Sequence, residues 1–152
     1  MTTVTFYQLN EESDREPDQQ LSAVCHIAAA WYSAKKRCVI WCADQASAEH
    51  VDEWLWQLPA DRFIPHNLTG EGPQGGAPVE LAWQQQHIGR PFLINMAASV
   101  PENITRYQQI AEFVPADEPG KQAARQRYKE YQRAGCDMAF MPVNKLYEKH
   151  DG

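Results

Sequence analysis

The chain has 152 residues, the size of one domain, with 43% hydrophobic and 22% charged residues, as in an ordinary globular protein. Its net charge of −6 argues against a protein whose own task is to grip a phosphate backbone. No apolar run approaches the ~18 residues of a membrane span, and the N-terminus lacks the features of a signal peptide, so we expect a cytoplasmic protein without membrane contact. The cysteines lack metal-binding spacing, which predicts free thiols and neither a metal nor another cofactor.

The first half of the chain alternates strand and helix patterns. Thr3–Leu9 is rich in β-branched and aromatic residues and predicts a strand. From Leu21 the apolar residues recur at helical spacing, and we expect this helix to carry Lys35 and Lys36 in its last turn, where cations suit the helix dipole. The continuously apolar run Cys38–Ala43 predicts a central strand that is covered on both faces.

A second helix is predicted from about Ala46 to Leu58, with an apolar stripe that includes Val51 and Leu55. Trp56 lies off this stripe. An exposed Trp is a candidate for a partner-binding surface, and burial under a neighbouring loop is the alternative.

The stretch from residue 63 to residue 83 is rich in glycine and proline. An apolar pair beginning at Phe63 is stopped by a proline, and Val79–Trp83 predicts a strand after the loop; we expect the segments around the loop to run antiparallel. The lysine of a phosphate-binding loop and the strand-to-helix context of a dinucleotide fingerprint are both missing, so a shaped turn or a partner surface is favoured. The alternative is a nucleotide-binding protein or enzyme that uses His66 and Glu71.

The second half continues the alternation. Phe92–Met96 predicts a strand, and Gln109–Val114 predicts another in preference to a short helix. A helix is expected from Pro119 to Gly135, with acid and proline at its start and glycine past its end, followed by a strand over Cys136–Val143. We therefore expect an α/β domain over residues 1–145, a three-layer sandwich with a mostly parallel central sheet, and a frayed tail over residues 146–152.

The last predicted helix has cations at four-residue spacing along one side: Lys121, Arg125, Lys129 and Arg133. The opposite side should pack on the sheet through small and aromatic residues: Ala123, Ala124, Tyr131 and Ala134. Tyr128 borders the cations, and Val114 lies just before the helix, where ligands collect in open α/β sheets.

A solvated helix face is the ordinary explanation of such a stripe. Arginine beside an apolar rim also suits a peptide carboxylate attached to a hydrophobic side chain. Nucleic acid is the weaker candidate, because four cations on one helix of an acidic protein would bind it weakly.

Several motifs, in order along the chain, resemble the chi subunit of bacterial DNA polymerase III. The most specific is FIPHNL-GEGP-GGAPVE-AW, between Phe63 and Trp83. It is accompanied by TFYQL, by DEWLW, and by FVP followed by KQAARQRYKEYQRAG, so the resemblance covers nearly the whole chain.

This resemblance implies a Rossmann-like fold without a nucleotide site, and a non-catalytic accessory subunit of a DNA-directed DNA polymerase that contacts DNA only indirectly. One implied partner is the psi subunit, and through it the clamp loader; the matching residues here are Trp56 and Phe63. The other is the acidic C-terminal tail of single-stranded DNA-binding protein, which ends in an aromatic residue with a free carboxylate. The residues that match the tail site are Val114, Lys121, Arg125, Tyr128 and Lys129. The chain departs from better-known members at Trp54 and after Cys136.

Overall fold

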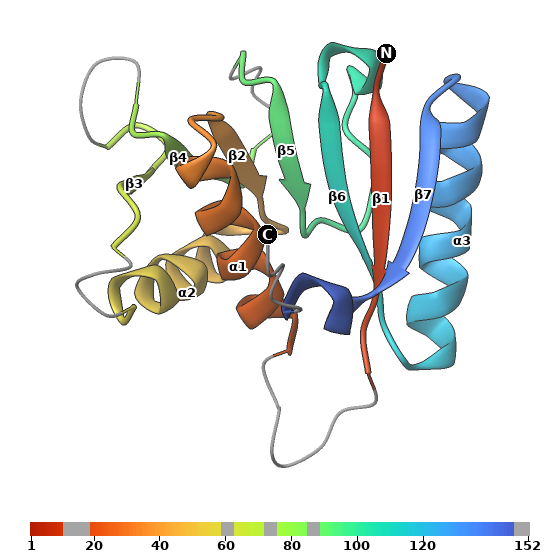
Figure 1. The fold of residues 1–152 in the computed structure, drawn as a ribbon, viewed down its shortest axis with the longest axis horizontal. Coiled ribbons are helices and arrows are strands. Elements are labelled where there is room, and N and C mark those ends of the chain that lie inside the picture. Colours follow the sequence, from red (N-terminus) through yellow and green to blue (C-terminus); the bar gives the residue numbers. More distant parts are fainter. Residues whose placement is uncertain (11–18, 59–62, 72–75, 85–88, 148–152) are drawn as a thin grey trace, which may run out of the picture.

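The structure, a computed structural model, describes residues 1–10, 19–58, 63–71, 76–84 and 89–147 (Figure 1). The described strands form one seven-stranded sheet in the order β3-β4-β2-β5-β6-β1-β7, and all the paired neighbours are parallel. The strands β3 and β7 therefore form the two edges. The strand bounds are β1 Thr3–Gln8, β2 Cys38–Trp41, β3 His66–Leu68, β4 Val79–Ala82, β5 Phe92–Asn95, β6 Gln109–Val114 and β7 Asp137–Pro142.

Helices cover both faces of the sheet and make three layers (Figure 1). The helices α1 (Gln19–Ser33) and α2 (Gln45–Trp56) pack on one face, and α3 (Glu118–Arg133) packs on the other. The short 3-10 helix η2 (Ile104–Arg106) lies on the α3 face, where Ile104 packs against the core. The predicted α/β sandwich is confirmed.

The apolar run of β2 reflects its position between β4 and β5. Cys38 and Ile40 belong to the core under α1 and α2, whereas Val39 belongs to the core under α3. All three side chains are buried, because successive residues of a strand point to opposite faces and both faces of this strand are covered.

The antiparallel pairing predicted around the glycine-rich loop is wrong. The strand β3 begins after Pro65, at His66, and pairs in parallel with β4. Proline has no backbone N–H to donate, but the Pro65 carbonyl accepts a hydrogen bond of 3.3 Å from Val79 N. The loop therefore carries the chain back to the start of β4 and does not close a hairpin.

The placement of Lys35 and Lys36 in the last turn of α1 is also wrong, because this helix ends at Ser33. Lys35 has a φ of 62°, a left-handed conformation that ends the helix and reverses the chain. Lys36 Nζ lies 5.8 Å from the centroid of the Phe92 ring.

The bounds of α3 agree with those predicted from the sequence. Asp117 caps the helix by accepting a 2.9 Å hydrogen bond from Gly120 N, and Pro119 lies in the first turn. Gly135, with a φ of 84°, follows the end of the helix.

The buried face of α3 differs from the prediction. Ala124 and Tyr131 are buried as expected, but Ala123 and Ala134 are exposed. The third buried position belongs to Arg127, which forms an ion pair with Glu112 of β6 beneath the helix. The helical spacing did not indicate the burial of Arg127, because its acidic partner lies on a different element.

The chain continues beyond β7 into the 3-10 helix η3 (Val143–Tyr147). Val143 is buried and Leu146 packs against the core under α1 and α2, whereas residues 148–152 of the expected tail lie outside the described residues. No helix within the described ranges is long and apolar enough to cross a membrane.

Candidate partner-binding surfaces

A pocket of about 300 Å³ opens between α3 and the edge strand β7. We call it the α3–β7 slot. The residues that line it are Phe6, Gln8, Val114, Lys121, Ala124, Arg125, Tyr128 and Phe140. Phe6 and Ala124 are buried, and Val114 is half-buried, so the slot combines apolar surface with two cationic side chains.

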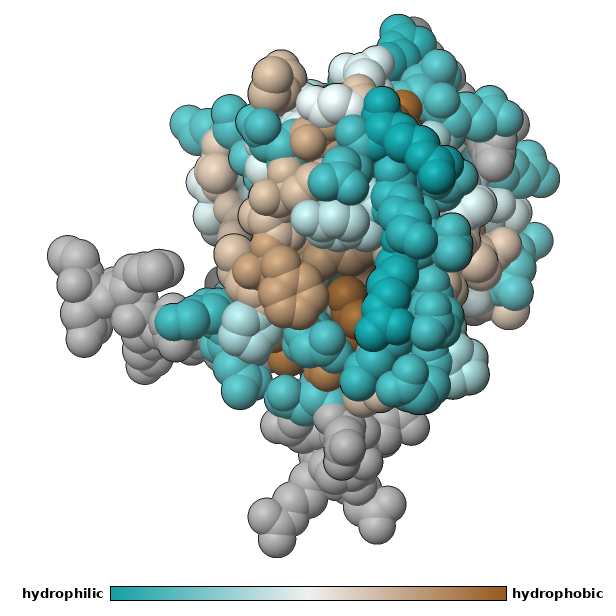
Figure 2. Space-filling view, turned by 90° about the vertical axis from the view of Figure 1, so that its right-hand side faces the viewer, coloured by the Kyte–Doolittle hydropathy of each residue, from teal (hydrophilic) through white to brown (hydrophobic). Residues whose placement is uncertain are grey.

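Four of the five residues predicted for the tail site line this one slot: Val114, Lys121, Arg125 and Tyr128. The fifth, Lys129, is exposed one helical turn beyond Arg125. Figure 2 views the molecule from the side of α3 and β7, and it shows a hydrophilic band beside a hydrophobic area with a hollow between them. Cations thus border an apolar slot, as the helical spacing predicted.

The sequence analysis missed the strand side of the slot. Phe140 of β7 is 61% exposed, and its Cα pairs with that of Phe6 in the neighbouring strand. The Phe6 ring in turn packs against Tyr128, with 5.5 Å between ring centroids. The alternation of β7 could place Phe140 on the α3 face, but only once the pairing of β1 with β7 was known.

A second surface lies on the opposite side of the sheet, where α2 ends near the edge strand β3. Trp56 is 60% exposed and Phe63 is 44% exposed, and their ring centroids are 5.4 Å apart. Of the two alternatives for Trp56, the structure shows exposure and not burial under a loop, and we call this pair the Trp56–Phe63 surface. Two large exposed rings in contact are unusual on a folded monomer and are typical of a partner-binding site.

His66 supports this surface from below. Its side chain is buried, its Nδ1 lies 2.7 Å from Ile64 O and its Nε2 lies 3.1 Å from Asp52 Oδ1. The His66 ring also packs edge-on against Trp56, at 4.9 Å between centroids. Glu71, by contrast, is exposed beyond the end of β3. These contacts give His66 a structural role under Trp56.

The end of the glycine-rich loop is held by a buried polar cluster. Gly76 has a φ of 77°, and a Cβ atom there would lie 2.5 Å from Glu80 Oε1 and 2.6 Å from Arg90 Nη2. Asn67 accepts a 2.6 Å hydrogen bond from Ala77 N and donates one of 3.2 Å to Glu80. The positive φ favours glycine at this position, which supports the interpretation of the loop as a shaped turn.

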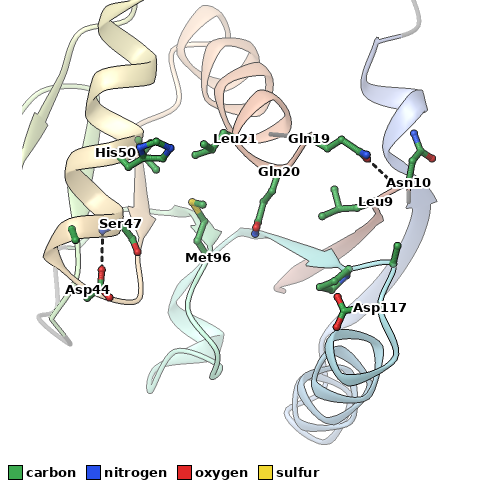
Figure 3. Close-up of a pocket in the computed structure, with 14 residues that line it drawn as sticks. Leu9, Asn10, Gln19, Gln20, Leu21, Asp44, Ser47, His50, Met96 and Asp117 are labelled. Atoms are coloured by element: carbon green, nitrogen blue, oxygen red, sulfur yellow. Dashed lines mark hydrogen bonds between the residues drawn. The ribbon is translucent and has the colours of Figure 1, made fainter. Parts of the chain in front are cut away.

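The place where an open α/β sheet would hold a nucleotide is a crevice of about 1050 Å³ at the carboxyl ends of the strands. Figure 3 shows Asp44 and Asp117 on opposite sides of it, with Met96 between them. Asp44 caps α2 by accepting a 2.8 Å hydrogen bond from Ser47 N, which lowers the pKa of Asp44, and Asp117 caps α3. A phosphate at either helix start would meet a carboxylate already bound there.

The cysteines lie in the interior or near it. Cys25, Cys38 and Cys42 are buried, and Cys136 is partly buried. In the part of the chain that the structure describes, no group of three or more His, Cys, Asp or Glu side chains could hold a metal ion.

Known proteins agree with this architecture. T4 UvsW aligns with a TM-score of 0.61 at 6% identity, over 93% of this chain and 41% of that one, a likeness of fold alone. The chain is 42% identical to the DNA polymerase III subunit chi of Escherichia coli over 144 residues, covering 91% of this chain and 96% of that protein. It is 34% identical to that of Haemophilus influenzae, covering 90% and 94%. Residues 1–139 match the family described as "DNA polymerase III chi subunit, HolC", and the chain therefore belongs to this family.

Proposed function

We propose that this chain is a non-catalytic adaptor of the replisome. It connects the acidic C-terminal tail of single-stranded DNA-binding protein to the psi subunit and, through psi, to the clamp loader. Its contact with DNA is indirect. The observation that carries the proposal is the α3–β7 slot, in which apolar surface and the cations Lys121 and Arg125 line the same pocket.

The chemistry of the slot suits a peptide that ends in an aromatic residue with a free carboxylate. The ring of such a residue enters between Val114 and Tyr128, where burial of apolar surface favours binding. Arg125 binds the terminal carboxylate, because a guanidinium can form two parallel charge-assisted hydrogen bonds with it. Lys121 and Lys129, one turn to either side, attract the acidic residues that precede the ring.

The Trp56–Phe63 surface is the proposed binding site for psi. Its rings are large, exposed and in mutual contact, the features of residues that dominate binding energy at protein interfaces. It lies beside β3 and the slot lies beside β7, and these strands are the two opposite edges of the sheet (Figure 1). Both partners can therefore bind at the same time, as an adaptor requires.

Calorimetric titration with an acidic peptide ending in phenylalanine tests the proposal. Arg125→Ala should weaken binding at least about tenfold, because a hydrogen bond to a charged group contributes about 1.5–3 kcal/mol. Lys129→Ala should have a smaller effect, since exposed ion pairs contribute less than about 1 kcal/mol. Arg133→Ala is the matched control: this cation lies on the same helix outside the slot lining and should change the affinity little.

Rising salt should weaken peptide binding by the parent chain and by Lys129→Ala more than binding by Arg125→Ala. The Arg125→Ala variant lacks the charge that contacts the peptide carboxylate most directly, so it has less electrostatic attraction for salt to screen. Equal affinities for the parent chain and Arg125→Ala would remove this helix from the binding site. If Arg133→Ala weakened binding as much as Arg125→Ala, binding would depend on the overall charge of α3. Specific binding in the slot would then be contradicted.

A further inference from the structure

We infer that Phe140 is a specificity-determining residue of the α3–β7 slot, which makes the slot prefer an aromatic ring at the end of the bound peptide. This inference rests on the proposed function, because it concerns the same site.

The position of Phe140 in the sheet carries the inference. Strand pairing aligns Phe140 of β7 with Phe6 of β1, so both side chains lie on the face that α3 covers. The helix buries Phe6, which is 1% exposed and contacts the rings of Tyr128 and Tyr131. It does not extend over Phe140, which stays 61% exposed at the sheet edge.

The slot therefore has two unlike walls. The α3 wall carries Lys121, Arg125 and Tyr128, and the β7 wall carries Phe140, with Phe6 between them. A ring that enters the slot meets aromatic side chains from both walls. Aromatic pairs in edge-to-face or offset contact are favoured beyond their buried area, so a terminal Phe gains more from these walls than a terminal Leu of similar hydrophobicity.

The exposure of Phe140 in the free chain separates this role from a structural one. A phenyl ring that is largely in contact with water contributes little to the folded core, so its removal should leave the fold intact. It still lines the slot, and a bound side chain would cover part of its exposed surface. Phe140 is thus a residue whose contacts are completed by the ligand.

The test compares acidic peptides that are identical except for a terminal Phe, Leu or Ala, titrated against the parent chain, Phe140→Ala and Phe140→Leu. Phe140→Ala should weaken binding of the Phe-ended peptide by about two- to tenfold, the size expected for an aromatic pair. Binding of the Ala-ended peptide should hardly change. Phe140→Leu should retain apolar contact and reduce chiefly the preference for Phe over Leu.

Tyr32→Ala provides the control, since Tyr32 is an exposed aromatic residue of α1 on the other face of the sheet. Thermal unfolding of each variant establishes that it is folded, and Phe140→Leu decides the matter should Phe140→Ala unfold. An equal loss for all three peptides, or no loss for any, would overturn the inference while leaving the adaptor function in place. If the parent chain binds none of the peptides, the proposed tail binding itself is refuted.

Discussion

Arg127 Nε lies 3.0 Å from Glu112 Oε1, and both side chains are buried between α3 and the sheet. The Glu112 carboxylate also accepts hydrogen bonds from Tyr131 and Asn95, and Arg127 Nη2 donates to the backbone oxygen of Phe113. Burial raises the pKa of Glu112, and the guanidinium acts against that rise. Because Arg127 lies between Arg125 and Tyr128 in sequence, the pair fixes the rotation of α3 that turns those two residues toward the slot.

Removing one member of this pair should destabilise the fold strongly. Arg127→Ala should lower the free energy of unfolding by about 3–5 kcal/mol, because it leaves a buried carboxylate without its counter-ion. Arg125→Ala, an exposed cation two residues away, should lower it by less than about 0.5 kcal/mol. Urea unfolding of both variants measures the difference, and similar values would show that the buried pair does not anchor α3.

Trp56→Ala should weaken psi binding by about 2 kcal/mol or more while changing stability by less than about 1 kcal/mol. Trp54→Ala is the comparison, because Trp54 is half-buried and packs against the core, so its removal should act mainly on stability. Thermal unfolding and calorimetry with psi separate the two effects. A loss of stability in Trp56→Ala as large as that in Trp54→Ala would make Trp56 a core residue.

The glycine-rich loop offers a matched pair of glycines with positive φ. Gly76→Ala should cost more stability than Gly70→Ala, since a Cβ at Gly76 requires the side-chain ends of Glu80 and Arg90 to shift whereas the space around Gly70 is open. Gly70→Ala should cost about 1 kcal/mol from backbone strain alone. Chemical unfolding of the two variants measures this. Equal costs would mean that the Glu80–Arg90 cluster moves aside easily. Gly75, the neighbouring glycine of the loop, lies outside the described residues.

The buried thiols should make the fold sensitive to alkali. Burial raises the pKa of Cys38 and Cys42 to about 12 and that of Cys25 to about 11, from an ordinary value near 9. The unfolded chain therefore loses these protons first. The contribution of the thiols to stability is complete below about pH 9 and falls as the pH rises toward the folded-state values. Unfolding free energies measured across this range should decline, and Cys38→Ala should decline less steeply than the parent chain.

The sequence predicted most elements because their signals are local. The strand over Gln109–Val114 and the helix from Pro119 to Gly135 have clear start and stop residues, and the structure confirms both. The position of Trp56 off the apolar stripe could be predicted for the same reason, although it left exposure and burial under a loop as alternatives. A single helix is enough to show which side chains leave its apolar stripe.

The remaining features depend on contacts between distant segments. The burial of Arg127 was not predicted from the spacing of the helix, although a glutamate inside an apolar strand, Glu112, indicated that a buried partner was needed. Phe140 could not be assigned to the slot before the pairing of β1 with β7 was known. The parallel direction of β3 likewise depends on the sheet and not on the loop that follows it.

The two carboxylates that cap α2 and α3 have a consequence for control. In nucleotide-binding proteins of similar architecture, a helix start at this edge of the sheet receives the phosphate group, and the occupant changes with the supply of ATP or its relatives. Asp44 and Asp117 fill these positions permanently, as part of the chain itself. A nucleotide phosphate could therefore bind at either helix start only by displacing a carboxylate of the same chain.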